Sequence, residues 1–254
     1  SVEPDWNTRP TAANFDEHGW YKMLANATYI DELITKHDEI MTKYDPEKRV
    51  ALVVDEWGTW HKVEDGTNPG FLYQQNCVRD ALVAGISLNI FNNHCDRVRI
   101  ANIAQAVNVL QSPILTEGDK MIKTPTWYVF RMYKNHMDAT HLNSFVTTEV
   151  IGPEDAKINA ITSSASCKDN KFAITLTNAD KDSKRTVKID LNGLKGKIKS
   201  ATATILTGEK MNSMNTFENP DEVVEKEVSV KVISDSVLEI ELPAMSVCQI
   251  EVEV

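Results

Sequence analysis

The fold class is decided by the stretch Val50-Ala51-Leu52-Val53-Val54-Asp55-Glu56-Trp57-Gly58. Its first five residues form an unbroken apolar run rather than an alternating one, which is typical of a parallel strand buried on both faces. Side chains at the carboxyl end of such a strand lie where α/β folds and barrels place their active sites. We therefore predict a buried parallel strand over 50–54, followed by two carboxylates in a position suited to chemistry.

The segments on either side of this strand alternate between helix and strand. Apolar residues recur at steps of three and four over 16–45, which predicts an amphipathic helical segment of one or two helices. A largely buried helix is predicted over 71–91 and a second strand over 98–104. A Thr-Pro pair opens a further helix over 124–135. This order predicts an α/β layered or barrel fold.

The hydrophobic period changes beyond His141. Six segments alternate apolar with polar residues, and turn residues separate them: 173–177, 186–191, 201–206, 228–232, 238–242 and 249–254. This pattern predicts an antiparallel β-sandwich of jelly-roll-like form over residues 141–254. Residues 1–140 contain two clear strands, whereas a complete eight-stranded barrel takes about 250 residues. We therefore expect 1–140 to be part of a larger α/β unit that a longer polypeptide or another chain completes.

Composition excludes several functional classes. The 254 residues include 37 acidic and 27 basic side chains, a formal charge of −10, so the sequence predicts no nucleic-acid partner. No apolar run approaches the roughly 20 residues that span a bilayer, so no membrane role is predicted. The start, Ser1–Trp6, has neither Met nor an apolar leader and is interpreted as a mid-chain cut. The compartment stays undetermined, with a cytoplasmic location favoured over a periplasmic or secreted one.

The four cysteines are expected to be reduced. Cys77 and Cys95 lie at the two ends of one predicted helix, roughly 27 Å apart, too far for a disulfide. Neither these residues nor His61 and His94 show the close spacing of a zinc site. No metal or organic cofactor is therefore implied.

Carboxylates and indoles cluster where the first strand ends. Asp55 and Glu56 are followed by Trp57 and Trp60. Aromatic faces beside a carboxylate suit a sugar ring, whose C–H face stacks on indole while its hydroxyls take hydrogen bonds. Strand alternation sends Asp55 and Glu56 in opposite directions, so one carboxylate faces a barrel mouth and the other meets the helices. The alternative interpretation is that the acids cap a helix and the tryptophans belong to the core.

Five segments carry a family resemblance: Phe15–Tyr21, Val54–Trp60, Arg79–Gly85, Ile103–Val109 and Thr207–Pro220. In this order they resemble α-L-arabinofuranosidases of glycoside hydrolase family 51. The resemblance implies a retaining glycosidase on a (β/α)8 TIM barrel followed by a β-sandwich, with this chain supplying the last two barrel strands and the sandwich. It implies a substrate with terminal α-L-arabinofuranosyl residues, in hemicellulose or its oligosaccharides, and a homo-oligomeric full-length protein.

The resemblance also assigns roles to individual residues. The glutamate of its Asp-Glu-Trp segment is the nucleophile, a role that falls on Glu56. Trp60 is expected to line the sugar site, and Gln105, at the end of the last barrel strand, to bond sugar hydroxyls. Trp57 is a further candidate for substrate contact, although packing suits it better.

One departure from the family pattern is serious. The family's acid/base lies in a Gly-Asn-Glu segment, and no glutamate here follows an asparagine. Glu117 is the nearest internal substitute, but it lies in a loop well beyond the second strand. The acid/base and the N-terminal barrel part are therefore missing from this chain, which we expect to be inactive alone.

Two alternative functions remain open. The chain could be a non-catalytic fragment whose sandwich serves for packing or carbohydrate binding, although its aromatic residues are few: Phe145, Phe172 and Phe217. It could also belong to an endo-acting glucanase or a xylosidase on the same scaffold, which only substrate profiling separates.

Overall fold

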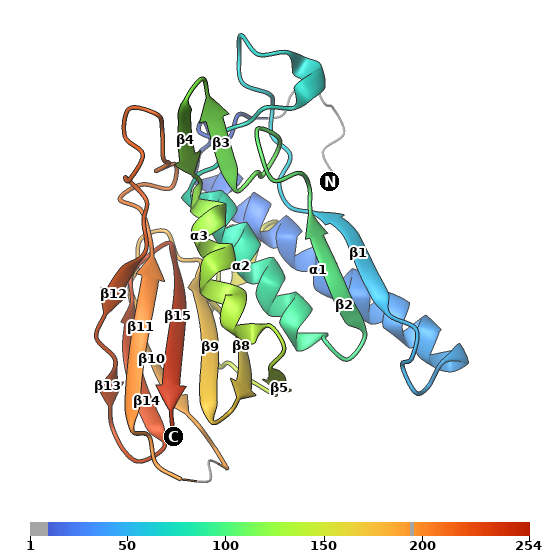
Figure 1. Ribbon diagram of the computed structural model, residues 1–254, viewed down its shortest axis with the longest axis vertical. Coiled ribbons are helices and arrows are strands. Elements are labelled where there is room, and N and C mark those ends of the chain that lie inside the picture. The colour runs from blue at the N-terminus through green and yellow to red at the C-terminus, as the bar shows by residue number, and fades with distance from the viewer. Residues whose placement is uncertain (1–9, 194–195) are drawn as a thin grey trace.

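The computed structural model describes residues 10–193 and 196–254, so the interpretation of Ser1–Trp6 lies outside the described residues. Three helices form the middle of the molecule: α1 (Glu17–Tyr44), α2 (Val78–Asn93) and α3 (Pro125–Tyr133). A small parallel sheet lies on one side of them and a larger antiparallel sheet on the other (Figure 1). None of the described helices is both long and apolar enough to cross a bilayer.

The predicted pair of parallel strands is confirmed. β1 (Leu52–Trp57) pairs in parallel with β2 (Val98–Ile103), and α2 forms the crossover between them. The expectation that both faces of this sheet are buried is wrong for the described residues, because Val53 is 41% and Ile100 is 51% exposed. One face packs on the helices, through Leu52, Val54 and Ala101. The other face of this sheet is therefore exposed among the described residues.

Helix α1 is a single helix of 28 residues, starting where its sequence predicts. The Asp16 carboxylate accepts the Gly19 N–H at 2.8 Å and caps its first turn. Its other end is tied to the start of β2 by the fully buried Arg97, which donates to Asp38 at 2.7 Å and to Asp45 at 2.9 Å. Burial alone would raise the pKa of Asp38, but hydrogen bonds from Lys48, Arg97 and Thr42 lower it to about 2.

The helix predicted over 71–91 begins later than expected. A 3-10 turn, η2 (Pro69–Phe71), is followed by Leu72 in the left-handed region at φ 55°, which stops helical propagation. α2 then starts at Val78, where the Asp80 carboxylate accepts the Cys77 N–H at 2.8 Å. The apolar residues before Val78 are therefore packed loop residues.

The helix opened by the Thr-Pro pair is confirmed. Thr124 is the N-cap of α3 with Pro125 as its first residue, and the 3-10 turn η3 (Lys134–His136) extends it to the predicted end. All four cysteines are free in the structure.

The predicted antiparallel sandwich is confirmed. Its first sheet has the order β12-β11-β15-β9-β8-β5, and its second has the order β10-β14-β13. The strands of these sheets are β5 (Thr140–Leu142), β8 (Ile161–Lys168), β9 (Lys171–Asn178), β10 (Arg185–Asp190), β11 (Ser200–Leu206), β12 (Lys226–Val228), β13 (Lys231–Val232), β14 (Val237–Leu242) and β15 (Ser246–Glu253). A separate apolar cluster, including Ile174, Ile205 and Leu238, fills the space between the sheets. The division into residues 1–140 and 141–254 stays a prediction.

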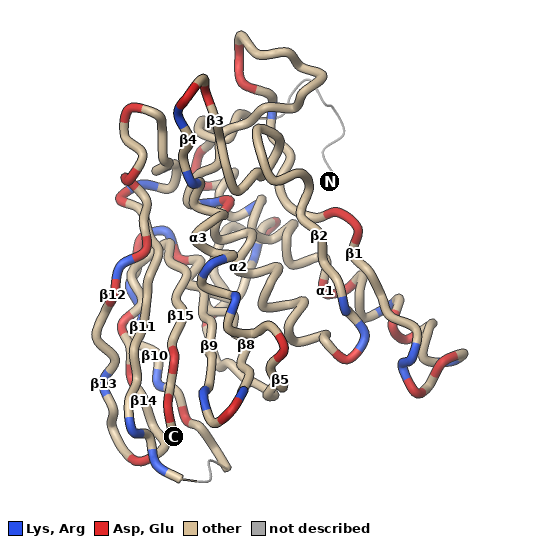
Figure 2. The backbone as a smooth tube through the Cα atoms, in the orientation of Figure 1, with Lys and Arg blue, Asp and Glu red and all other residues tan. Residues whose placement is uncertain are grey.

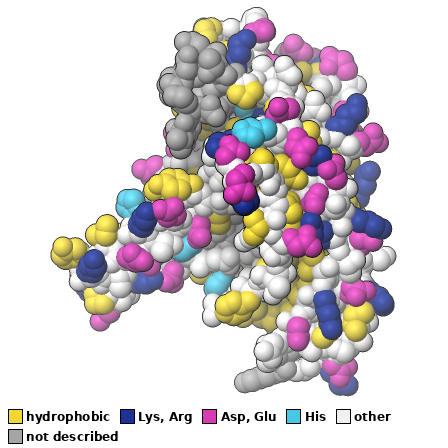
Figure 3. All heavy atoms as spheres, turned by 180° about the vertical axis from the view of Figure 1, so that it is seen from behind, with side chains coloured by type: hydrophobic (Ala, Val, Ile, Leu, Met, Phe, Trp, Pro, Cys, Tyr) yellow, Lys and Arg dark blue, Asp and Glu magenta, His cyan; other side chains and the backbone are white. Residues whose placement is uncertain are grey.

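Two short hairpins complete the described fold. β3 (Ile114–Glu117) pairs with β4 (Lys120–Lys123), and β6 (Val150–Ile151) pairs with β7 (Ile158–Asn159). Acidic and basic side chains are intermixed along the chain (Figure 2) and over the face seen from behind (Figure 3). On the face seen from behind, basic side chains are therefore interspersed with acidic ones.

Helices α2 and α3 pack on the six-stranded sheet through polar as well as apolar groups. Gly85 of α2 approaches the sheet so closely that an added Cβ would lie 2.9 Å from a methyl group of Thr177. His136 hydrogen-bonds Ser166 Oγ through Nδ1 at 2.8 Å and Thr175 Oγ1 through Nε2 at 3.1 Å. Burial, together with the charge of His141, lowers the pKa of His136 to about 4.

We expect stability to fall by roughly 2 kcal/mol between pH 7 and pH 5 because of His136. The unfolded chain binds a proton at this imidazole near pH 6.5, whereas the folded chain, with its lowered pKa, binds it only near pH 4. Urea midpoints at the two pH values measure the loss. His136→Gln should flatten the dependence, and the exposed His37→Gln should not. If the urea midpoint changed equally with pH in the parent, His136→Gln and His37→Gln, the loss of stability would not come from His136.

Candidate active site

The two carboxylates lie within β1 rather than beyond it. Val54 pairs with Ala101 and Trp57 with Ile103, so three steps along β1 match two along β2. This extra residue is a β-bulge, which bends a strand and re-aims its side chains. Asp55 and Glu56 are both exposed, so neither carboxylate is buried against the helices.

Glu56 lines a cavity of about 900 Å³ between the first half of α1 and residues 56–61. At one end the lining is polar and includes Trp60, His61, Asn14 and Arg79. Elsewhere the lining includes apolar side chains of α1, together with Trp57 of β1 and Val83 of α2; those of α1 include Met23, Ala27, Ile30 and Leu33. An accessible carboxylate beside indole rings is therefore present at the carboxyl end of a parallel strand, where α/β enzymes bind ligands.

Trp57 lines the same cavity, but its ring is engaged in packing. It is 8% exposed, with ring centroids 5.4 Å from Phe91 of α2 and 5.9 Å from Phe130 of α3. Its indole Nε1 has no hydrogen-bond partner among the described residues. Trp57 therefore anchors the end of β1 to the helices directly beside Glu56.

Trp60 lies on the rim of the cavity. It is partly buried, and it stands between Thr59 and His61, whose side chains are buried. The structure therefore brings Glu56, Trp57 and Trp60 to one cavity, as the sequence predicts for a sugar site.

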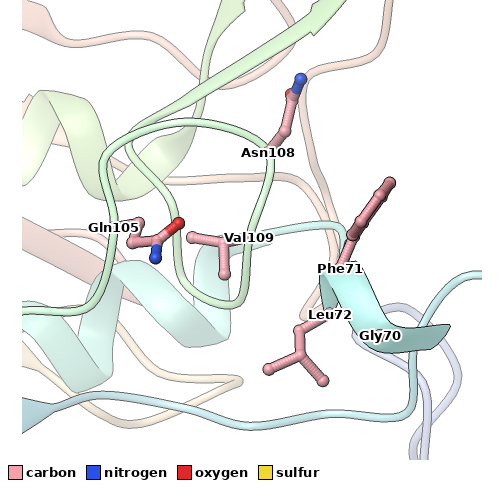
Figure 4. Close-up of a pocket in the computed structure, with 6 residues that line it drawn as sticks. All are labelled: Gly70, Phe71, Leu72, Gln105, Asn108 and Val109. Carbon is pink, nitrogen blue, oxygen red and sulfur yellow. The ribbon is translucent and has the colours of Figure 1, made fainter. Parts of the chain in front are cut away.

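Gln105 lies in a second hollow of about 430 Å³ (Figure 4). Loops after both strands form it, with Gly70, Phe71 and Leu72 from one and Gln105, Asn108 and Val109 from the other. The Gln105 amide is directed towards Val109 in Figure 4. The buried Val109 lines this hollow and its neighbour Leu110 lines the cavity of Glu56. Gln105 therefore shares the sheet edge with Glu56 but not its cavity.

A second carboxylate for chemistry with Glu56 is not supplied by the described lining. Asp16 is the other acid that lines the cavity, and its carboxylate caps α1. Glu117 ends β3 in the β3–β4 hairpin and does not line the cavity. Within residues 10–193 and 196–254, no group of three His, Cys, Asp or Glu side chains is placed to hold a metal. Among the described residues, Glu56 is therefore the acid of this cavity that is not engaged as a helix cap.

Sequence reasoning missed a buried polar cluster beneath this cavity. Asp80 is fully buried and binds His61 Nε2 at 2.8 Å and Thr59 Oγ1 at 2.6 Å. Burial would raise the pKa of Asp80, but the neighbouring His61, the Arg79 charge and the Cys77 N–H together hold it well below its usual range. The signal in the sequence is an Arg-Asp pair at the start of an otherwise apolar helix, which needs buried partners.

The chain is similar, over nearly its whole length, to proteins named arabinofuranosidases. A family model described as Alpha-L-arabinofuranosidase C-terminal domain matches residues 55–246. An intracellular exo-alpha-L-arabinofuranosidase of Bacteroides ovatus is 40% identical over 97% of this chain and 48% of its own length.

Solved structures agree with this similarity. The crystal structure of the GH51 arabinofuranosidase from Xanthomonas axonopodis pv. citri has 44% identity and a TM-score of 0.93, covering 98% of this chain and 50% of its own. The crystal structure of an alpha-L-arabinofuranosidase from Thermotoga maritima, an arabinose complex, has 26% identity and a TM-score of 0.77. The match covers 92% of this chain and 50% of the other. The chain therefore spans about half the length of the relatives that it matches.

Proposed function

This chain belongs to the family of α-L-arabinofuranosidase C-terminal domains, within glycoside hydrolase family 51, and from this premise we propose that it forms part of a retaining exo-α-L-arabinofuranosidase. The substrate would be a terminal α-L-arabinofuranosyl residue of hemicellulose or its oligosaccharides. The observation that carries the proposal is the exposed Glu56, beside Trp60, in a cavity at the carboxyl end of a parallel strand.

The reaction would be a double displacement at the anomeric carbon. The Glu56 carboxylate attacks that carbon while a second carboxyl group protonates the departing glycosidic oxygen, which leaves a covalent glycosyl ester. Water then attacks the ester as the second group removes a proton, so the product keeps the starting configuration. Such pairs lie about 5–5.5 Å apart. Because Asp16 is engaged as a helix cap, the acid/base would come from protein outside this chain.

The apolar half of the cavity supports the same arrangement. β1 pairs with β2 along one edge in a two-stranded sheet, and α1 precedes β1 as α2 precedes β2. A barrel repeats strand and helix in this order, so a strand before α1 would pair with the other edge of β1. Apolar side chains of α1, such as Ala27 and Ile30, would then pack beneath it. The sugar would occupy only the polar end, near Glu56 and Trp60.

Trp60 and Gln105 would complete sugar recognition. The indole of Trp60 would stack on the furanose, and the Gln105 amide would bond hydroxyls from the neighbouring hollow. We also propose an intracellular location and a homo-oligomeric full-length protein; the relative from Bacteroides ovatus is named intracellular. The native mass of the full-length protein tests the second point.

The full-length protein should release arabinose from 4-nitrophenyl α-L-arabinofuranoside, with the α anomer formed first. Proton NMR during the first minutes distinguishes retention from inversion. The matched β-D-xylopyranoside and a β-glucan serve as controls for the xylosidase and endo-glucanase alternatives. Residues 1–254 alone should release arabinose from an arabinofuranosyl oligosaccharide at least about a thousandfold more slowly than the full-length protein, because the sugar alkoxide is a poor leaving group and receives no proton. Early β anomer, or cleavage of the glucan only, would refute the proposal.

A further inference from the structure

A buried cluster holds the loop that carries Trp60. It consists of Thr59, His61, Arg79, Asp80 and Gln111, and we call it the Asp80 cluster. Each member is at most 2% exposed. Burying so many polar groups is costly unless each finds partners, and here the partners come from separate segments. The cluster therefore fixes the relative position of those segments.

One carboxylate oxygen binds both neighbours of Trp60. Asp80 Oδ1 accepts from Thr59 Oγ1 at 2.6 Å and lies 2.8 Å from His61 Nε2. Because the residues on both sides of Trp60 are held by the same carboxylate, the backbone that carries the indole has little freedom to move. Trp60 lines the cavity that Glu56 lines.

The backbone of the same loop is held as well. The Thr59 N–H donates to Gln111 Oε1, and the His61 N–H donates to Gln74 Oε1 at 2.7 Å. Gln111 in turn donates through Nε2 to the Asp80 carbonyl at 3.1 Å. Gly58, at φ +119°, lets the chain pass Gln111, because an added Cβ would lie 3.0 Å from Gln111 Oε1. Side-chain and backbone contacts therefore fix the same two residues, Thr59 and His61.

The cluster also joins the loop to the first turns of two helices. Asp80 Oδ2 accepts the Cys77 N–H at 2.8 Å at the start of α2, where a helix favours negative charge. Arg79 Nη2 lies 3.4 Å from His61 Nδ1, and its guanidinium lies 3.5 Å from the ring centroid of Phe15, just before α1. A tautomer with the proton on His61 Nε2 donates to Asp80 and accepts from Arg79.

We propose that Asp80 is a positioning residue of the sugar site: through Thr59 and His61 it holds the Trp60 indole against the furanose beside Glu56. This inference rests on the proposed function. Asp80 does not touch the substrate; it fixes the loop before the sugar arrives, which reduces the ordering cost of binding. Weakening the hydrogen bonds from Thr59 and His61 to Asp80 should therefore let the Trp60 indole move, which raises KM and lowers kcat/KM.

Thr59→Val tests the positioning role of Asp80 in the full-length protein. The change keeps the shape of the side chain but removes its donor to Asp80, a loss equivalent to roughly a 3- to 10-fold rise in KM. Incorporated 5-fluorotryptophan reports on the indole directly, with the Trp60 resonance identified by its absence in Trp60→Phe. In Thr59→Val that resonance should move or broaden. Thr59→Ser, which retains the hydroxyl, should restore both readouts.

Thr177→Val is the matched control. Thr177 is fully buried in β9 and its hydroxyl bonds Thr162 Oγ1 at 2.7 Å, so its loss removes one buried hydrogen bond away from the loop. It should lower stability by a similar amount and change neither KM nor the Trp60 resonance. His61→Phe, which removes the other donor to Asp80 Oδ1, makes an independent comparison in the same direction.

Two outcomes would overturn the proposal. In the first, Thr59→Val and His61→Phe leave the Trp60 resonance and KM as they are in the parent. In the second, Thr177→Val changes both readouts equally, which reveals a general loss of stability. A parent protein that hydrolyses no arabinofuranoside would instead contradict the proposed function. The fluorine spectra would still decide whether Asp80 positions the Trp60 indole, because they require no substrate.

Discussion

Glu56→Gln should lower kcat/KM for arabinofuranoside hydrolysis by the full-length protein at least about a thousandfold, equivalent to roughly 4 kcal/mol of transition-state stabilisation. A neutral amide oxygen is a far weaker nucleophile than a carboxylate and forms no stable glycosyl ester. The fold should be unaffected, because Glu56 is exposed and its carboxylate makes no hydrogen bond or ion pair with the described residues. Initial rates and an unfolding midpoint measure the two effects.

Asp55→Asn is the matched control for this prediction. It removes an equally exposed carboxylate one residue away and should leave most of the activity. Glu56→Gly adds a second test, since azide should enter the vacated space and attack the anomeric carbon of an activated aryl arabinofuranoside. The aryl alcohol leaves and a glycosyl azide of inverted configuration forms. If activity survived Glu56→Gln but not Asp55→Asn, Asp55 and not Glu56 would be the nucleophile.

Asn89→Leu should lower the free energy of unfolding by roughly 3–4 kcal/mol, because it removes the centre of a buried polar network. Asn89, on α2, is 1% exposed. Its Oδ1 lies 2.9 Å from Tyr133 Oη, 3.0 Å from Ser164 Oγ and 2.8 Å from Thr175 Oγ1. Its Nδ2 donates to Thr162 Oγ1 at 2.9 Å. Leucine fills a similar volume but leaves these hydroxyls without their shared partner.

Urea unfolding of the parent and variants measures this effect through the midpoint at constant m. Asn92→Ala is the control, because Asn92 is only partly buried and its Nδ2 donates to Ser164 Oγ at 2.9 Å. It should cost about 1 kcal/mol. If Asn89→Leu costs no more than Asn92→Ala, the network does not hold the helices on the sheet. A changed m value would indicate that helices and sheet unfold separately.

Local sequence patterns determined much of the fold. The apolar run over 50–54 predicted a parallel strand, and alternation predicted the sandwich strands, because both patterns reflect which faces of a strand are buried. The Thr124-Pro125 pair predicted a helix start, since proline at the first helical position has its φ already fixed near the helical value and has no N–H to leave unpaired. Five segments in order identified the family, and with it Glu56 and Trp60 as candidates.

Other features depend on contacts between residues distant in sequence. The bulge at Glu56 depends on the register between β1 and β2, which are more than 40 residues apart. The separation of Gln105 from the cavity depends on how two loops pack. None of these could be read from local periodicity, which describes one segment at a time.

The sequence by itself determined most of the helices and strands, the family and the acidic residue offered for chemistry. Tertiary structure alone decided how that residue is presented: exposed on a bulge, beside a tryptophan whose two neighbours share one buried carboxylate. Asp80 reaches Thr59 across 21 positions and Asn89 reaches Thr175 across 86. Hydrogen bonds over such separations exist only after the chain has folded, because closing those loops costs entropy that the packed core must first offset.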